Sequence, residues 1–114
     1  MHDLVSWLNY LELGTKTSTA VGLERVTVVA KRLQLLPFPR FSITVAGTNG
    51  KGSNVALLEQ VLLSAENKVA AYTSPHLLSY NERIRINGKN IDDESLCQAF
   101  SAVEKARGET SLNY

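Results

Sequence analysis

Residues 41–53 read FSITVAGTNGKGS, a short β-branched run followed at once by a glycine-rich loop that contains a lysine. The run 41–46 is typical of a strand, and the spacing of Val55, Leu58 and Leu62 predicts that a helix follows the loop. A strand that turns through glycines into a helix directs several backbone N–H groups, and the positive end of the helix dipole, at one point. The stretch therefore predicts a phosphate-binding loop.

The residues of this loop supply different parts of a nucleotide site. Gly47 and Gly50 let the backbone approach phosphate without a Cβ in the way, and Lys51 supplies a mobile positive charge for the β- and γ-phosphates. The general pattern G-x-x-x-x-G-K-[ST] is matched imperfectly, because its first glycine falls at Val45 and Gly52 precedes the hydroxyl residue. The predicted ATP-binding residues are Gly47, Thr48, Asn49, Gly50, Lys51, Gly52 and Ser53.

Spacing and turn signals organise the rest of the chain. The predicted segments are a helical lead-in over 1–36, a βαβ unit over 41–72, a loop and hairpin over 73–91, and a helix over 92–108. The two strands of the βαβ unit, 41–46 and 68–72, should be parallel. Asn87-Gly88 is a hairpin-turn signal. The predicted fold class is α/β: an incomplete P-loop NTPase-like parallel sheet with flanking helices and a small β-hairpin.

Length and composition narrow the class of protein. A chain of 114 residues with 44% apolar and 20% charged residues is one small globular domain at most. A net charge of +1 with scattered basic residues gives no reason to expect a nucleic-acid or anionic-membrane partner. No apolar run reaches the roughly 18 residues of a membrane span, so no membrane partner and a cytoplasmic location are expected. Cys97, the single cysteine, suits a reducing compartment and is expected on or beside a buried helix face.

Three stretches resemble one enzyme family. Ala46–Ser53 resembles the ATP loop of folylpolyglutamate synthases and bifunctional dihydrofolate synthase/folylpolyglutamate synthases, which belong to the Mur ligase superfamily. Thr73–Leu77, continuing to Glu82–Ile86, is similar to the family's signature loop after the second strand. Gly22–Val26 resembles the entry into the family's second helix. The resemblance covers essentially the whole chain and implies the fold of the Mur ligase central domain.

The resemblance implies an ATP- and Mg²⁺-dependent ligase that adds L-glutamate to dihydropteroate and/or tetrahydrofolate through an acyl phosphate. By position, Ser74 would be a magnesium ligand, while Pro75 and His76 would shape the loop over the phosphates and the acceptor. Arg83 would contact a substrate carboxylate. From the residues alone, Ser74 equally suits a turn before Pro75, His76 a surface histidine, and Arg83 the solvated face of a strand.

Two further stretches resemble pterin-contacting motifs of bifunctional members. The first is the loop between the first two helices, where this chain has Ala20 and related sequences tend to carry an acidic residue. The second begins at Ser111 and carries Asn113 where a threonine is familiar. The candidate substrate residues are Ser18, Thr19, Ala20, Val21, His76, Arg83 and Asn113.

The family's other magnesium ligands, its modified lysine and its glutamate-binding C-terminal domain are expected downstream of Tyr114. We therefore expect residues 1–114 to be the N-terminal part of the ATP-binding domain of a longer, monomeric enzyme, with the C-terminal domain absent. No catalytic residue is assigned within them, and ligation by them alone is not expected. Glutamate-dependent ADP release by the isolated chain would contradict this expectation.

Three alternatives stay open. A P-loop kinase or hydrolase should have the first glycine of the general pattern and a hydroxyl residue directly after its lysine, and this chain has neither. A non-catalytic nucleotide-binding module is disfavoured by the exposed strand edge expected after Tyr72. A Mur-type peptide ligase would share the fold, but Thr73–Leu77 favours the folate branch. Gly22–Arg25 and Ala106–Gly108 favour a bifunctional enzyme, although the sequence leaves one activity or two open.

Overall fold

The computed structural model of the chain describes residues 3–17 and 22–112, which form two compact units. The first unit comprises residues 1–41 and 93–114, and the second comprises residues 42–92. No helix within the described ranges is long and apolar enough to cross a membrane.

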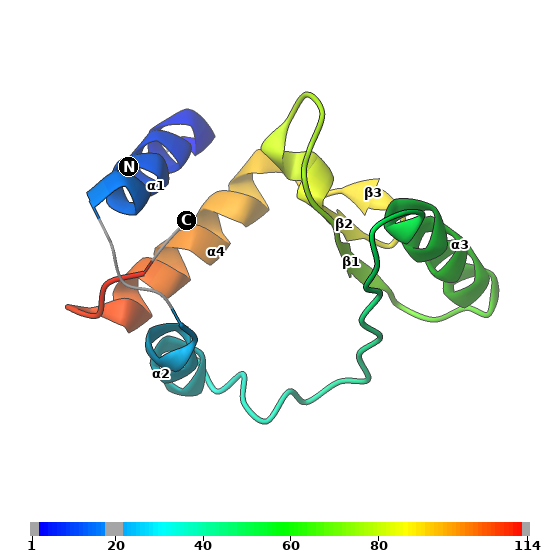
Figure 1. Ribbon diagram of the computed structural model, residues 1–114, viewed down its shortest axis with the longest axis horizontal. Coiled ribbons are helices and arrows are strands. Elements are labelled where there is room, and N and C mark those ends of the chain that lie inside the picture. The colour runs from blue at the N-terminus through cyan, green and yellow to red at the C-terminus, as the bar shows by residue number, and fades with distance from the viewer. Residues whose placement is uncertain (1–2, 18–21, 113–114) are drawn as a thin grey trace. The chain divides into compact units, whose positions relative to one another are not determined.

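The first unit consists of helices α1 (Leu4–Thr17), α2 (Glu24–Arg32) and α4 (Asp93–Arg107), with α4 packed against both of the others (Figure 1). Among the side chains that the structure describes, the buried apolar ones are Trp7 of α1, Val29 of α2 and Leu96 of α4, each at most 5% exposed. The Trp7 ring lies 5.9 Å from that of Phe100. The helical spacing of the sequence therefore predicted these helices correctly, because each presents an apolar stripe to its neighbours.

Polar contacts also join α1 and α2 to α4 in this unit. The Tyr10 hydroxyl donates to Glu104 Oε1 at 2.9 Å, and Arg107 Nη2 donates to the same oxygen at 2.7 Å. The hydrogen bond from Arg107 is the main cause that lowers the pKa of the Glu104 carboxyl. Arg32 Nη1 donates to the carbonyls of Ala106 and Arg107, at 3.1 and 2.9 Å, and so satisfies the last turn of α4.

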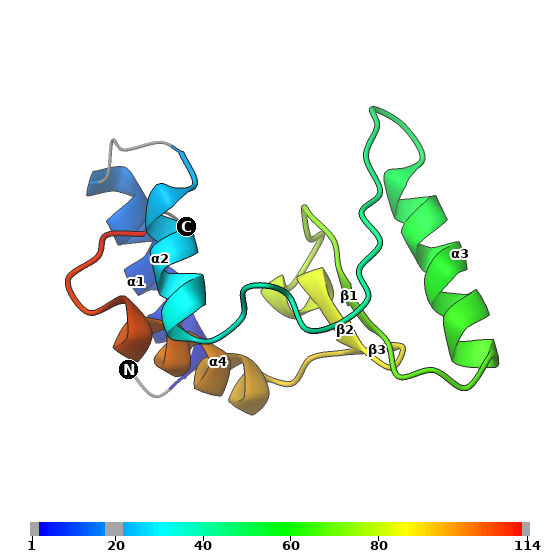
Figure 2. The ribbon, with the colours of Figure 1, turned by 90° about the horizontal axis from the view of Figure 1, so that it is seen from below.

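The second unit contains one helix and a small sheet. Helix α3 (Lys51–Ser64) precedes strand β1 (Ala70–Tyr72), and the 3₁₀ helix η1 (Tyr80–Arg83) leads into β2 (Ile84–Ile86) and β3 (Lys89–Asn90). The strand order is β1-β2-β3, and both pairings are antiparallel (Figure 2). Asn87 and Gly88 have φ of 51° and 84°, the left-handed pair that a two-residue hairpin turn requires, so the predicted hairpin is confirmed.

A buried ion pair joins α3 to the sheet. Glu59 of α3 is 4% exposed and accepts from Arg85 of β2, at 2.5 Å from Nη2 and 3.2 Å from Nε. This two-bond geometry fits the planar guanidinium to the carboxylate. Val55, Leu58 and Leu62 are half-buried as their spacing predicts, whereas Leu57 and Val61 are exposed.

The predicted parallel pairing is wrong. In the described part of the chain, residues 41–46 form no strand and Phe41 is 91% exposed, while β1 pairs antiparallel with β2. β2 follows β1 closely in sequence, so this pairing costs little loop-closure entropy. A parallel pair with 41–46 would instead make a sheet that needs cover on both faces. The structure therefore has helices and a small antiparallel sheet where the sequence predicted a parallel one.

Candidate functional site

The glycine-rich loop 47–53 runs from segment 41–46, which has no regular secondary structure, into α3. Gly47 has φ of 149° and Gly50, the residue directly before the helix, has φ of 75°. Residues other than glycine rarely adopt such positive φ values. A Cβ added to Gly50 would have no heavy atom within 4 Å. Glycine permits both of these backbone conformations, and at Gly50 it is the conformation, not the available space, that favours glycine.

The first turn of α3 has backbone N–H groups without a side-chain cap. No side chain of the described residues caps this helix, and the bond from Asn54 N to Gly50 O, at 3.0 Å, begins its intrahelical ladder. The three preceding N–H groups lack an intrahelical partner, as at any helix start. Lys51 and Ser53 are exposed beside them. The arrangement suits an anion with several oxygens, such as a polyphosphate.

The loop after β1 is held in a defined shape by one carboxylate. Glu82 accepts from the backbone N–H groups of Leu77, Leu78 and Ser79, at 3.0, 2.9 and 2.6 Å. These bonds, that from Leu77 first, lower the pKa of Glu82. Ser79 and Glu82 also form the capping box of η1.

His76 and Arg83, two of the predicted substrate residues, contact each other. Arg83 Nε donates to His76 Nδ1 at 2.8 Å, and the Arg83 guanidinium lies 5.1 Å from the centre of the Tyr80 ring. The His76 and Tyr80 rings are 5.7 Å apart. The sequence named both residues as separate candidates, and nothing in their spacing signals that they would pair.

Ser74, the predicted magnesium ligand, is exposed at the start of this loop, where its bond to Pro75 is cis. No group of three or more His, Cys, Asp or Glu side chains in the described ranges is arranged to hold a metal. A magnesium ion that accompanies a nucleotide needs only one or two protein oxygens, since phosphates and water supply the rest. A single hydroxyl fits that mode of binding, and the role of Ser74 stays a prediction.

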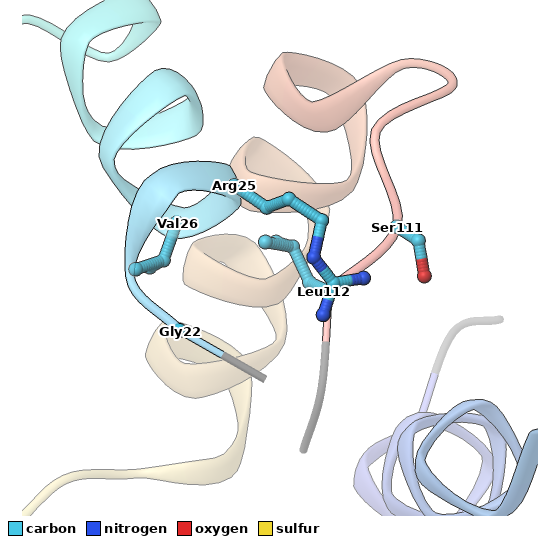
Figure 3. A pocket seen from close by; sticks show the side chains of 5 residues that line it. All are labelled: Gly22, Arg25, Val26, Ser111 and Leu112. Carbon is cyan, nitrogen blue, oxygen red and sulfur yellow. The ribbon is translucent and has the colours of Figure 1, made fainter. Parts of the chain in front are cut away.

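A cavity of about 270 Å³ lies in the first unit, lined by Gly22, Arg25, Val26, Ser111 and Leu112 (Figure 3). Figure 3 shows the Arg25 side chain extending from α2 toward the segment that carries Ser111 and Leu112. The remaining predicted substrate residues, Ser18, Thr19, Ala20, Val21 and Asn113, lie outside the described residues. Gly22 and Leu112, which are adjacent in sequence to Val21 and Asn113, both line this cavity. Arg25 was not singled out from the sequence.

Cys97 is half-buried on α4. Burial is the main cause that raises the pKa of its thiol, and the charges of Asp93 and Asp3 act in the same direction. A raised pKa disfavours the reactive thiolate, in accord with a structural role.

The chain is similar over nearly its whole length to known enzymes. No protein-family model matches the chain. The chain is 46% identical over 111 residues to the dihydrofolate synthase/folylpolyglutamate synthase of Escherichia coli, and 40% identical over 93 residues to that of Bacillus subtilis. These matches cover 97% and 81% of the chain but only 26% and 21% of the relatives, so the chain spans about a quarter or less of their length.

The chain is also similar in structure to solved enzymes. The Escherichia coli FolC in complex with DHPP and ADP matches with a TM-score of 0.90 at 47% identity, covering 98% of this chain and 27% of that one. The Lactobacillus casei folylpolyglutamate synthetase matches with a TM-score of 0.83 at 27% identity, covering 97% of this chain and 30% of that one.

Proposed function

We infer that this chain, which is homologous over nearly its whole length to the dihydrofolate synthase/folylpolyglutamate synthases, provides the ATP-binding part of a glutamate-adding ligase. The observation that carries the proposal is the loop 47–53, with left-handed Gly50 directly before the uncapped start of α3 at Lys51. Structures of 46% and 47% identical relatives have been solved, one with bound ADP and the other with bound AMPPNP, Mn and L-glutamate. We propose that these residues correspond to the N-terminal part of the ATP-binding domain, with the divisions 1–36, 41–72, 73–91 and 92–108.

In the proposed site, Gly47 to Ser53 hold the triphosphate of ATP through backbone N–H groups, and Lys51 neutralises the β- and γ-phosphates. Ser74 supplies a hydroxyl to Mg²⁺. When bound, MgATP supplies the phosphoryl group that activates a carboxylate for amide formation. The chain's own contribution is positioning and charge neutralisation, which requires no covalent protein nucleophile.

The proposed acceptor is dihydropteroate or tetrahydrofolate, and the second substrate is L-glutamate. The cavity beside Arg25 supports a pterin-bearing acceptor, because its lining combines the apolar side chains of Val26 and Leu112 with a cation. Two of its lining residues, Gly22 and Leu112, are adjacent in sequence to the candidate residues Val21 and Asn113. We propose that both activities, dihydrofolate synthesis and polyglutamylation, are present. The 46% identical relative from Escherichia coli is named for both, whereas a 35% identical relative from Dictyostelium discoideum is named only as a putative folylpolyglutamate synthase. A monomeric, cytoplasmic enzyme completes the proposal.

The test is nucleotide binding by the chain, measured by calorimetric titration with AMPPNP and Mg²⁺. Lys51→Met should weaken binding by about 10- to 100-fold, since hydrogen bonds to charged groups contribute roughly 1.5–3 kcal/mol. Lys89→Met is the matched control, because Lys89 is an exposed lysine of the same unit on β3. Equal affinity of the Lys51→Met variant and the wild type would refute the proposal.

A further inference from the structure

The hydrogen bond between Arg83 and His76 determines which imidazole nitrogen carries a hydrogen. The Nε of an arginine always bears a hydrogen and has no lone pair to offer, so it is the donor in any hydrogen bond that it makes. His76 Nδ1, at 2.8 Å from it, must therefore be the acceptor. In a neutral imidazole the hydrogen then sits on Nε2.

Both partners of this bond are held by further contacts. Tyr80 lies under the Arg83 guanidinium and beside the His76 ring, at 5.1 and 5.7 Å. The carbonyl of Arg83 accepts from Thr73 N at 2.8 Å, which fixes the base of the loop on which His76 stands. The orientation of the imidazole is thus set by the loop and does not require a ligand.

The other nitrogen of His76, Nε2, is not buried. Among the described residues, Nε2 has no hydrogen-bond partner in this structure. In the same residues, no buried side-chain nitrogen or oxygen lacks a partner, so this unpartnered Nε2 is not buried. His76 therefore has one N–H donor that is neither buried nor paired with a described residue, two residues beyond Ser74.

We propose that Arg83 is a positioning residue, which holds His76 as the Nε2–H tautomer so that His76 donates a hydrogen bond to an anionic substrate oxygen. That oxygen belongs to a phosphoryl group or to a carboxylate. The inference rests on the proposed ligase function and deepens it, because it assigns the ligand contact to His76 and the orienting role to Arg83.

The first experiment needs no ligand and no variant. Long-range ¹H–¹⁵N correlation of the imidazole, recorded on the chain at about pH 8 where an ordinary imidazole is neutral, reports the hydrogen on each nitrogen. A single Nε2–H tautomer is expected. Arg83→Glu, which places an acceptor beside Nδ1, should shift the hydrogen to Nδ1, with amide exchange at Thr73 as the check that the loop is still closed. Nδ1–H in the wild-type chain would overturn the assignment.

The second experiment asks what His76 contacts. Gln places an N–H donor near the position of Nε2, whereas Asn places one nearer Nδ1. His76→Gln should therefore retain affinity to within about threefold, and His76→Asn should lose about tenfold or more. Titration with AMPPNP and Mg²⁺ tests a phosphoryl oxygen, and separate titration with dihydropteroate tests a carboxylate.

Loss for one ligand alone identifies the source of the oxygen. Equal loss in both variants for each bound ligand, or no loss in either variant, would overturn the contact. If neither ligand binds the wild-type chain, the proposed function fails while the imidazole spectrum still decides the role of Arg83. The two failures are therefore distinguishable.

Discussion

Removing the cation of Arg85 should destabilise the second unit more than removing the anion of Glu59. The two side chains form one ion pair, but Glu59 is 4% exposed and Arg85 is 32% exposed. Arg85→Met keeps the aliphatic stem and leaves a buried carboxylate without its partner. Glu59→Gln leaves a guanidinium that water still reaches.

The magnitude follows from this asymmetry. Breaking a fully buried pair by removing one partner costs about 3–5 kcal/mol. Because one-third of Arg85 is exposed and screened, we expect about 2 kcal/mol for Arg85→Met and below about 1 kcal/mol for Glu59→Gln. The double variant Glu59→Met/Arg85→Met should recover most of the loss, since an apolar pair carries no buried charge.

Native-state amide hydrogen exchange measures these differences within the unit itself. The informative amides are Asn87, which donates to the Val69 carbonyl at 2.7 Å, and Ile91, which donates to that of Ile84 at 2.9 Å. An effect of about 2 kcal/mol corresponds to roughly 30-fold faster exchange through local opening. Faster exchange in Glu59→Gln than in Arg85→Met, or a double variant worse than Arg85→Met, would refute the reasoning.

Three further results are expected. Leu96→Ala should destabilise the first unit by about 2–5 kcal/mol, because Leu96 is 1% exposed. The loss is measured as a lower midpoint concentration of denaturant when unfolding is followed by helix content, and Val5→Ala, at an exposed position, is the control. Gly50→Ala should cost about 1 kcal/mol of stability and speed amide exchange at Asn54, because a φ of 75° strains alanine even though no atom would contact its Cβ. Gly52→Ala, at a helical position, should neither destabilise the helix nor speed this exchange. The pKa of Glu82 is lowered on folding, so its contribution to the stability of the loop is fully present above about pH 4.5, the unfolded pKa. This contribution is lost as the pH falls through the lower pKa of the folded state. The protection factors of the Leu77, Leu78 and Ser79 amides, taken relative to the intrinsic exchange rate at each pH, should follow that curve in the wild type. In Glu82→Gln the same protection factors should not vary with pH over this range.

Local patterns in the sequence determined much of this protein. The glycines before Lys51, the Asn87-Gly88 turn and the apolar stripes of α1, α2 and α4 each depend on residues a few positions apart. Such features are decided by backbone sterics and helical periodicity, which act over that same short range. The glycine-rich loop and its helix could therefore be predicted, as could the similarity to dihydrofolate synthase/folylpolyglutamate synthases.

Tertiary structure alone decided which distant segments meet. A β-branched run such as 41–46 has the composition of a strand, but a strand exists only where a neighbour pairs with it, and β1 pairs with β2. The contacts of Glu59 with Arg85 and of Arg83 with His76 likewise depend on loop closure and side-chain geometry. The sequence thus determined that a glycine-rich loop opens a helix, and the tertiary structure decided which distant side chains pair, because hydrogen bonds between distant residues have no sequence period.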